Sequence, residues 1–181
     1  MNLLKKKNGF TLIEILVAMG IFAIAMMIVS VIFLNLSNLQ RNLNSVQQLQ
    51  NDGRFMLEKI AKEVRMRELD YEMTEPDPLT GLTDKLIFKP DDTDAVLSII
   101  KAGENLSFDL DGVSGNINSH NVAVDDIKFI ITPATDPNLP GSDRFQPKVT
   151  VLLTISNRQG QVAEQYIKQL TIQTTISSKI Y

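Results

Sequence analysis

The 181-residue sequence contains no cysteine and only one histidine, His120. Without cysteine the chain has no disulfide, no thiolate nucleophile and no cysteine-ligated zinc or iron–sulfur site. One histidine cannot supply a multi-histidine metal site within one chain. A net charge of −3 and the lack of a basic stripe argue against binding to nucleic acid. These absences leave few groups for catalysis.

Candidate catalytic residues are correspondingly scarce. His120 stands between Ser119 and Asn121 and is interpreted as a surface loop residue. The pair Asp125-Asp126 is interpreted as a strand edge, not as an acid–base pair. No serine–histidine–aspartate set and no glycine-rich phosphate loop is recognisable in the sequence. We therefore expect no enzyme activity, no cofactor, no metal site and no small-molecule substrate.

A long apolar run dominates the amino-terminal part of the chain. From Phe10 to Leu34 every residue is apolar, glycine or alanine except Thr11, Glu14 and Ser30. The short segment before it is basic, with consecutive lysines at Lys5, Lys6 and Lys7. Spanning the hydrocarbon core of a bilayer takes about 20 residues at roughly 1.5 Å each. We expect residues 10–34 to form a transmembrane helix, with the lysines cytoplasmic and the rest of the chain extracytoplasmic.

A cleaved secretory signal is an alternative interpretation of the same run. Phe10–Phe22 would then be the apolar region of the signal, and Ala23-Ile24-Ala25 would be a small-x-small cleavage site. Two features argue against it: the mature protein would begin with the apolar residues Met26–Leu34, and Glu14 would lie inside the apolar region.

Glu14 needs a compensating partner, because a carboxylate costs roughly 2.5 kcal/mol or more at the centre of a membrane helix and less near its end. Cleavage between Gly9 and Phe10 would create a positively charged amino group four residues before Glu14, one helical turn away. Within one chain that cation would oppose the helix dipole, so pairing between neighbouring subunits is at least as plausible. The alternative is an uncut anchor in which Glu14 reaches the headgroups.

The residues from Lys5 to Ala18, with the sequence KKKNGFTLIEILVA, resemble the class III signal of type IV prepilins and type II secretion pseudopilins. The resemblance implies that a prepilin peptidase cuts after Gly9 and methylates the amino group of Phe10. It also implies that Glu14 pairs with the amine of another subunit during assembly. The chain would then be the substrate of an enzyme and a structural subunit, with residues 1–9 as a cleaved leader.

The apolar pattern continues beyond the membrane segment at spacings mostly of three and four residues, through Leu36, Leu39, Leu43, Val46, Leu49, Phe55, Leu57, Ile60 and Val64. No proline occurs between Phe10 and Pro76, so one helix of about 60 residues is permitted, with residues 35–69 as its amphipathic continuation. Glu58 and Lys62 have the spacing of a favourable helical ion pair.

The segment Asp52–Arg65 carries a second resemblance. Its Asp-x-Arg and Ile-Ala-x-Glu-Val-Arg strings are similar to the helix that precedes the β-domain in J-type minor pseudopilins and W-type minor pilins. In those families such subunits often lie at the tip of the filament.

We expect residues 70–84 to form a linker loop and residues 85–181 to form a β-domain. We expect strands at Lys85–Lys89, Ala95–Lys101, Asn105–Asp109, Val122–Thr132, Lys148–Ser156 and Gln161–Ser177. A turn at Asn157–Gly160 would join the last two. A helix followed by antiparallel strands predicts a pilin-like α+β fold, in which the long amino-terminal helix packs on an antiparallel sheet.

Three loop segments remain open. Thr132–Pro147 is rich in proline and is either a partner-binding loop or a passive connector. Asp91–Asp94 and Asp109–Gly112 offer oxygen ligands for calcium, but a solvated loop and a turn explain them without a metal.

The sequence therefore favours a minor pseudopilin or minor pilin that is processed at Gly9 and Phe10 and assembled through Glu14. Its expected partners are the prepilin peptidase, other pilins or pseudopilins through the amino-terminal helix, and inner-membrane lipid. It would be stored as a single-pass inner-membrane protein and then enter a pseudopilus or pilus. The alternatives are an uncleaved, signal-anchored binding module that does not polymerise, and a cleaved secreted enzyme. Secretion, pilus and DNA-uptake machines share this signal.

Overall fold

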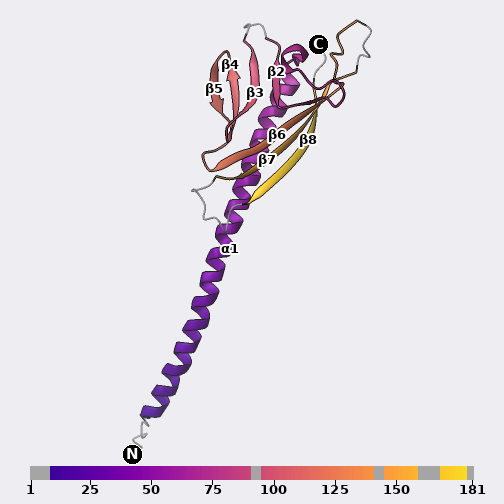
Figure 1. The fold of residues 1–181 in the computed structure, drawn as a ribbon. Coiled ribbons are helices and arrows are strands. Elements are labelled where there is room, and N and C mark those ends of the chain that lie inside the picture. Colours follow the sequence, from indigo (N-terminus) through magenta and orange to yellow (C-terminus); the bar gives the residue numbers. More distant parts are fainter. Residues whose placement is uncertain (1–8, 91–94, 141–144, 159–167, 179–181) are drawn as a thin grey trace, which may run out of the picture. The chain divides into compact units, whose positions relative to one another are not determined.

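The computed structural model describes residues 9–90, 95–140, 145–158 and 168–178 (Figure 1). The helices are α1 (Leu12–Met66) and α2 (Tyr71–Thr74). The strands are β1 (Leu82–Thr83), β2 (Lys85–Phe88), β3 (Leu97–Ala102), β4 (Asn105–Leu110), β5 (Val113–Asn116), β6 (Val122–Thr132), β7 (Lys148–Asn157) and β8 (Gln169–Ser177). The order of elements confirms the predicted α+β class with a long amino-terminal helix.

The chain divides into two compact units, Met1–Leu43 and Asn44–Tyr181. In the first unit, helix α1 is continuous from Leu12 and all of its side chains from Leu12 to Leu36 are exposed. Within the described residues α1 is long and apolar enough to cross a membrane, by length and composition alone. An apolar helix with no protein covering it is consistent with a membrane-anchored protein.

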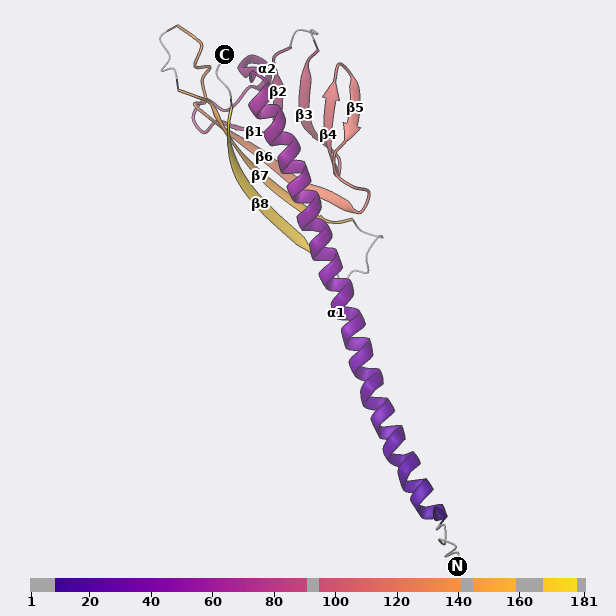
Figure 2. The ribbon, with the colours of Figure 1, turned by 180° about the vertical axis from the view of Figure 1, so that it is seen from behind.

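The second unit holds the core and contains two antiparallel sheets, where the sequence analysis expected one. The strand orders are β1-β6-β7-β8 and β2-β3-β4-β5. The half of α1 that belongs to this unit lies along the face of the β1-β6-β7-β8 sheet (Figure 2). The alternation of buried and exposed residues is regular in β7, where Val149, Val151, Leu153 and Ile155 are buried. These residues form one core with the helix.

The buried face of α1 in this unit is Ser45, Leu49, Gly53, Met56, Ile60 and Val64. Of the predicted stripe, Leu49, Ile60 and Val64 are buried as expected. Phe55 is 48% exposed, so its assignment to the packed face was wrong, and Met56 takes that place. The spacing 49, 53, 56, 60, 64 keeps a helical period of three or four residues, and Phe55 falls one residue out of phase with it.

The predicted strands differ from the observed ones mainly at short elements. The loop expected over Tyr71–Asp84 contains α2, whose N-cap is Asp70, and the two-residue strand β1, which pairs with β6. Strand β5 was not predicted, because all of its residues are exposed and it has no alternation. Strand β6 has the predicted bounds.

The connection between β7 and β8 departs from the predicted turn. The amide of Asn157 donates to the carbonyl of Lys168 over 3.2 Å, so the two strands are still paired at Asn157, where the turn was expected to begin. The described part of the last predicted strand begins at Gln169. Residues 159–167 lie outside the described residues.

Asp125 and Asp126 lie at a β-bulge in β6, which is an inner strand of its sheet. The interpretation as a strand edge was therefore wrong. The Asp125 carboxylate accepts hydrogen bonds from Ser156 Oγ over 2.9 Å and from Gln169 Nε2 over 3.1 Å. The bulge places both acids on the exposed face.

Candidate functional site

The proposed cleavage point lies just before the first residue of α1. Gly9, Phe10 and Thr11 have no helical structure, and α1 begins at Leu12. Phe10 is 82% exposed, and a Cβ added to Gly9 would meet no atom within 4 Å. The chain's own packing therefore does not require glycine at this position. Lys5, Lys6 and Lys7 lie outside the described residues.

Glu14 closes a capping box at the start of α1. Its Oε2 accepts a hydrogen bond from the Thr11 amide over 3.3 Å, and the Glu14 amide donates to Thr11 Oγ1 over 3.3 Å. Each side chain thus satisfies a backbone donor of the other residue, which fixes the first helical turn. This role was not predicted from the sequence, although Thr-x-x-Glu before an apolar run is a signature of the capping box.

Glu14 shares one face of the helix with large apolar side chains. A shallow groove of about 490 Å³ is lined by Phe10, Glu14, Ile15, Ala18, Met19 and Phe22. All of these residues belong to the first compact unit. Glu14 is therefore the one charged residue among the apolar residues that line this groove.

The loop between Thr132 and Pro147 is tied to the rest of its unit near both ends. The Tyr71 hydroxyl donates to the carbonyl of Pro133 over 3.3 Å, and Asn138 Nδ2 donates to Glu68 Oε1 over 3.1 Å. At the other end Gln146 Nε2 donates to the carbonyl of Ser178 over 2.7 Å. Residues 141–144 lie outside the described residues.

Two titratable groups near the base of this loop are perturbed. Burial, together with the negative charge of Asp136, raises the pKa of Tyr71 to about 12. A hydrogen bond to Glu68 raises the pKa of Lys89. The same Glu68 carboxylate accepts from Lys89 Nζ and from Asn138, so it connects β2, the end of α1 and the loop.

The acidic segments considered for calcium are in part occupied by backbone hydrogen bonds. Asp109 Oδ1 accepts from the Gly112 amide over 2.7 Å, and Asp111 Oδ1 accepts from the Val96 amide over 3.1 Å. Asp111 and Gly112 both have positive φ, as expected of the turn. Asp91–Asp94 lies outside the described residues. Among the residues that are described, no group of three or more metal-ligating side chains occurs.

His120 is exposed in a turn, as predicted.

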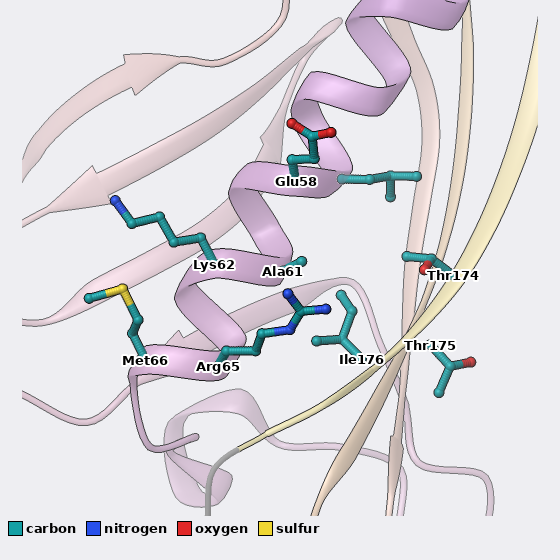
Figure 3. A pocket seen from close by; sticks show the side chains of 9 residues that line it. Glu58, Ala61, Lys62, Arg65, Met66, Thr174, Thr175 and Ile176 are labelled. Atoms are coloured by element: carbon teal, nitrogen blue, oxygen red, sulfur yellow. The ribbon is translucent and has the colours of Figure 1, made fainter.

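A groove that the sequence analysis did not predict lies between α1 and the edge strand β8. It has a volume of about 550 Å³ and is lined on the helix by Leu57, Glu58, Ala61, Lys62, Arg65 and Met66, and on the strand by Thr174, Thr175 and Ile176. Figure 3 shows the guanidinium of Arg65 pointing toward Ile176 and Thr174, whereas Lys62 and Met66 point away from β8. The expected Glu58–Lys62 ion pair is not formed in this part of the structure: the two side chains diverge (Figure 3).

Comparison with known proteins gives one family match, at the amino terminus. No curated protein and no solved structure matches the chain. The family match is to the prokaryotic N-terminal methylation motif, and its span includes Gly9, Phe10 and Glu14. Residues 4–33 therefore carry a class III, prepilin-like signal, which supports a type IV pilin-like or pseudopilin precursor.

Proposed function

We propose that this protein is a minor pseudopilin or minor pilin, a structural subunit of a type II secretion pseudopilus or a type IV pilus. The observation that carries the proposal is the match of residues 4–33 to the methylation motif. The motif includes the first part of a continuous helix, Leu12–Met66, and this first part is apolar and uncovered. A subunit that moves from a membrane into a filament needs such a helix, because neighbouring helices replace lipid around it.

Processing is the first proposed step. A prepilin peptidase cuts the peptide bond between Gly9 and Phe10 and the new amino group of Phe10 is methylated. The accessible, non-helical backbone at Gly9–Thr11 supports this step, since a protease needs an extended substrate. Because no atom of the described residues would lie within 4 Å of a Cβ at Gly9, a requirement for glycine there would come from the peptidase.

Assembly is the second proposed step. The Glu14 carboxylate of one subunit pairs with the Phe10 amine of a neighbour, which removes two charges that are each costly in apolar surroundings. Before assembly the carboxylate is held by Thr11, in a capping box at the exposed end of the helix. The exchange of a weak local hydrogen bond for an ion pair favours docking of the helix.

The resemblance of Asp52–Arg65 to J-type and W-type subunits supports a minor subunit at or near the filament tip. Several of these residues have a structural role in the second unit. Asp52 accepts a hydrogen bond from Ser119, Gly53 allows a close approach to β7 and β8, and Ile60 and Val64 are buried. We place this unit on the extracytoplasmic side of the inner membrane before assembly, with other pilins or pseudopilins as partners.

The proposal is tested by intact-mass and amino-terminal peptide mass spectrometry of the protein from membranes that contain a prepilin peptidase. The expected product begins with N-methylated Phe10. Gly9→Val is the matched control and should remain uncut, because its side chain crowds the scissile bond in the peptidase without disturbing the chain's own packing. An intact amino terminus at Met1 would favour the anchored binding module instead, and an end beyond Ala25 would favour a secreted protein.

A further inference from the structure

Strand β8 is a long sheet edge that, among the described residues, has none of the usual features that protect an edge against pairing. It forms one end of the β1-β6-β7-β8 order, and among the described strands it pairs only with β7. Its sequence, Gln169–Ser177, contains no charged residue and no proline, and its register with β7 has no bulge. Natural proteins normally protect such edges, because the unpaired backbone N–H and C=O groups can pair with another strand.

The other sheet edges of the described part are protected. Strand β1 has two residues, and β5 has four, one of them Gly115. The outer side of β2 is covered by the chain that follows α1, since the Asp70 amide donates to Ile87 and the Lys89 amide donates to Glu68. The open edge at β8 is therefore a local feature of this strand and not a general property of the fold.

The pairing with β7 shows which backbone groups of β8 remain free. Hydrogen-bonded backbone pairs are formed by Asn157 with Lys168 and by Pro147 with Ser178. In antiparallel pairs the hydrogen-bonded positions alternate, so the even-numbered residues of β8 face β7. The amides and carbonyls of the odd-numbered residues point to the free edge, and these are Gln169, Thr171, Gln173, Thr175 and Ser177.

The groove beside this edge provides room and chemistry for the side chains of an added strand. Leu57, Ala61 and Ile176 give it an apolar floor. Arg65, at the end near Ile176 (Figure 3), is exposed and has no ion-pair partner among the described residues. A strand added to β8 would place every second side chain in the groove, because side chains alternate between the two faces of a sheet.

We propose that the edge of β8 binds an extended segment of a partner protein by strand addition. The segment carries apolar side chains at alternate positions, which enter the groove, and a carboxylate that pairs with Arg65. Backbone hydrogen bonds to the free edge give most of the affinity, and the groove gives the specificity. This surface goes beyond the proposed function and does not depend on processing at Gly9, so the two proposals fail independently.

The test uses the full-length chain in detergent micelles and a synthetic peptide of about the length of β8. In the peptide threonine alternates with valine, and an aspartate occupies the last valine position at one end or, in a second peptide, at the other. Hydrogen–deuterium exchange followed by mass spectrometry should show slower exchange of Gln169–Ser177 when one of these peptides is present. Exchange of Val113–Asn116 at the β5 edge should not change.

Three matched comparisons separate strand addition from other binding. A peptide N-methylated at alternate residues loses the donors of one edge and should bind at least about tenfold more weakly, while the protein is unaltered. Gln173→Pro should have a similar effect, because it removes an edge-facing amide that β7 does not use, whereas Gln173→Ala should bind like wild type. Replacing the peptide aspartate by asparagine should weaken binding to the wild-type protein several-fold. The same replacement should not weaken binding to the Arg65→Gln variant. The Lys62→Gln variant is the control for charge, because Lys62 points away from β8.

Equal binding of the methylated and unmethylated peptides would overturn the proposal, as would a lack of protection of β8 at millimolar peptide. Protection of β8 that rises with protein concentration in the absence of peptide would also overturn it, because a second copy of the chain would then occupy the edge.

Discussion

Among the described glycines, Gly81 leaves the least room for a side chain. It has a φ of +69°, and an added Cβ would lie 2.1 Å from the carbonyl oxygen of Ile131. The Gly81 amide donates to Asp77 over 2.7 Å, and its carbonyl accepts from Ile131 over 2.9 Å, so the segment cannot move away without losing both bonds. The residue thus connects the α2–β1 segment to the central strand β6.

We expect Gly81→Ala to lower the free energy of unfolding by about 3 kcal/mol, from the backbone strain and the overlap with Ile131 together. Gly103→Ala is the matched control, because Gly103 also has positive φ but an added Cβ would meet no atom within 4 Å. It should cost only about 1 kcal/mol. Urea denaturation followed by tyrosine fluorescence measures both values, and equal losses would contradict the steric argument.

Tyr71 gives a pH dependence of known sign. Its pKa is about 12 in the folded protein and close to 10 in the unfolded chain, so the folded state holds the proton more tightly. The stability that this adds is fully present below pH 10 and is lost as the pH rises through 12. A rise from 10 to 12 corresponds to about 2.7 kcal/mol, and the half-buried position reduces the expected effect to about 1 kcal/mol.

Absorbance of the tyrosinate form, compared between wild type and Tyr71→Phe, isolates this group from the other tyrosines. The difference should titrate near pH 12, and the variant should lose less stability between pH 10 and 12. Lys89, whose pKa is also raised, contributes with the same sign in both proteins and cancels in the comparison. If the absorbance difference between the two proteins titrates near pH 10, Tyr71 is not buried beside the loop Thr132–Pro147.

Among single residues, the sequence predicted more of the amino-terminal site than of the groove. Gly9, Phe10 and Glu14 lie within six consecutive residues, so their proximity follows from the chain itself. Arg65 and Thr174 are more than 100 residues apart, and their approach depends on which strand forms the sheet edge. The capping box was available in the sequence, because Thr11 and Glu14 have its spacing.

At the scale of elements, Gly53 determines how closely α1 approaches the sheet. An added Cβ would lie 2.5 Å from Ile172 Cδ1 and 3.1 Å from Ile155 Cδ1, so side chains of β7 and β8 occupy the space that a larger residue would need. Glycine lowers helix propensity by about 1 kcal/mol relative to alanine. The close packing of helix and sheet offsets that cost.

We expect Gly53→Val to lower the free energy of unfolding by about 1 to 3 kcal/mol, because two isoleucines must leave their positions. Asn51→Val introduces the same side chain at an exposed position of the same helix and should change stability by less than about 0.5 kcal/mol. Denaturation of both variants in detergent measures these changes in the free energy of unfolding. A stabilised Gly53→Val protein would mean that propensity, and not packing, governs this position.

The predictability of each element follows from the strength of its pattern. Strand β6 was predicted with its exact bounds because buried and exposed residues alternate over most of its length. The short β1 has no pattern of its own and exists because Leu82 and Thr83 pair with Ile130 and Phe129, far along the chain. The division of the strands into two sheets is likewise a matter of long-range pairing, which periodicity does not encode.

For the whole molecule, one helix serves two environments. Its first part has an apolar surface that only Glu14 and Ser30 interrupt, and its last part has a single buried stripe. Both patterns are local; the sequence predicts the change between them near residue 34, and the first buried residue of α1 is Ser45. The matched motif ends at residue 33, one residue before the end of the apolar run at Leu34. The position of β8 at a sheet edge is set by long-range pairing and was therefore visible only in the structure.

The role of Glu14 in assembly can be separated from its role at the helix end. Glutamine can accept the same hydrogen bond from the Thr11 amide, so Glu14→Gln keeps the capping box and removes the charge. Glu14→Leu removes both, and Thr11→Ala removes the hydroxyl while it keeps the charge. We expect processing at Gly9 in all three variants, because the peptidase site precedes the helix.

If charge pairing drives assembly, Glu14→Gln and Glu14→Leu should both reduce the mature protein in purified filaments at least about tenfold. An unpaired charge costs roughly 2.5 kcal/mol in apolar surroundings, and each 1.4 kcal/mol corresponds to a factor of ten. Thr11→Ala should remain close to wild type. The ratio of filament to membrane protein, measured by quantitative mass spectrometry, distinguishes the two roles. Wild-type incorporation of Glu14→Gln would leave helix capping as the function of this carboxylate, because the variant differs from wild type there only in charge.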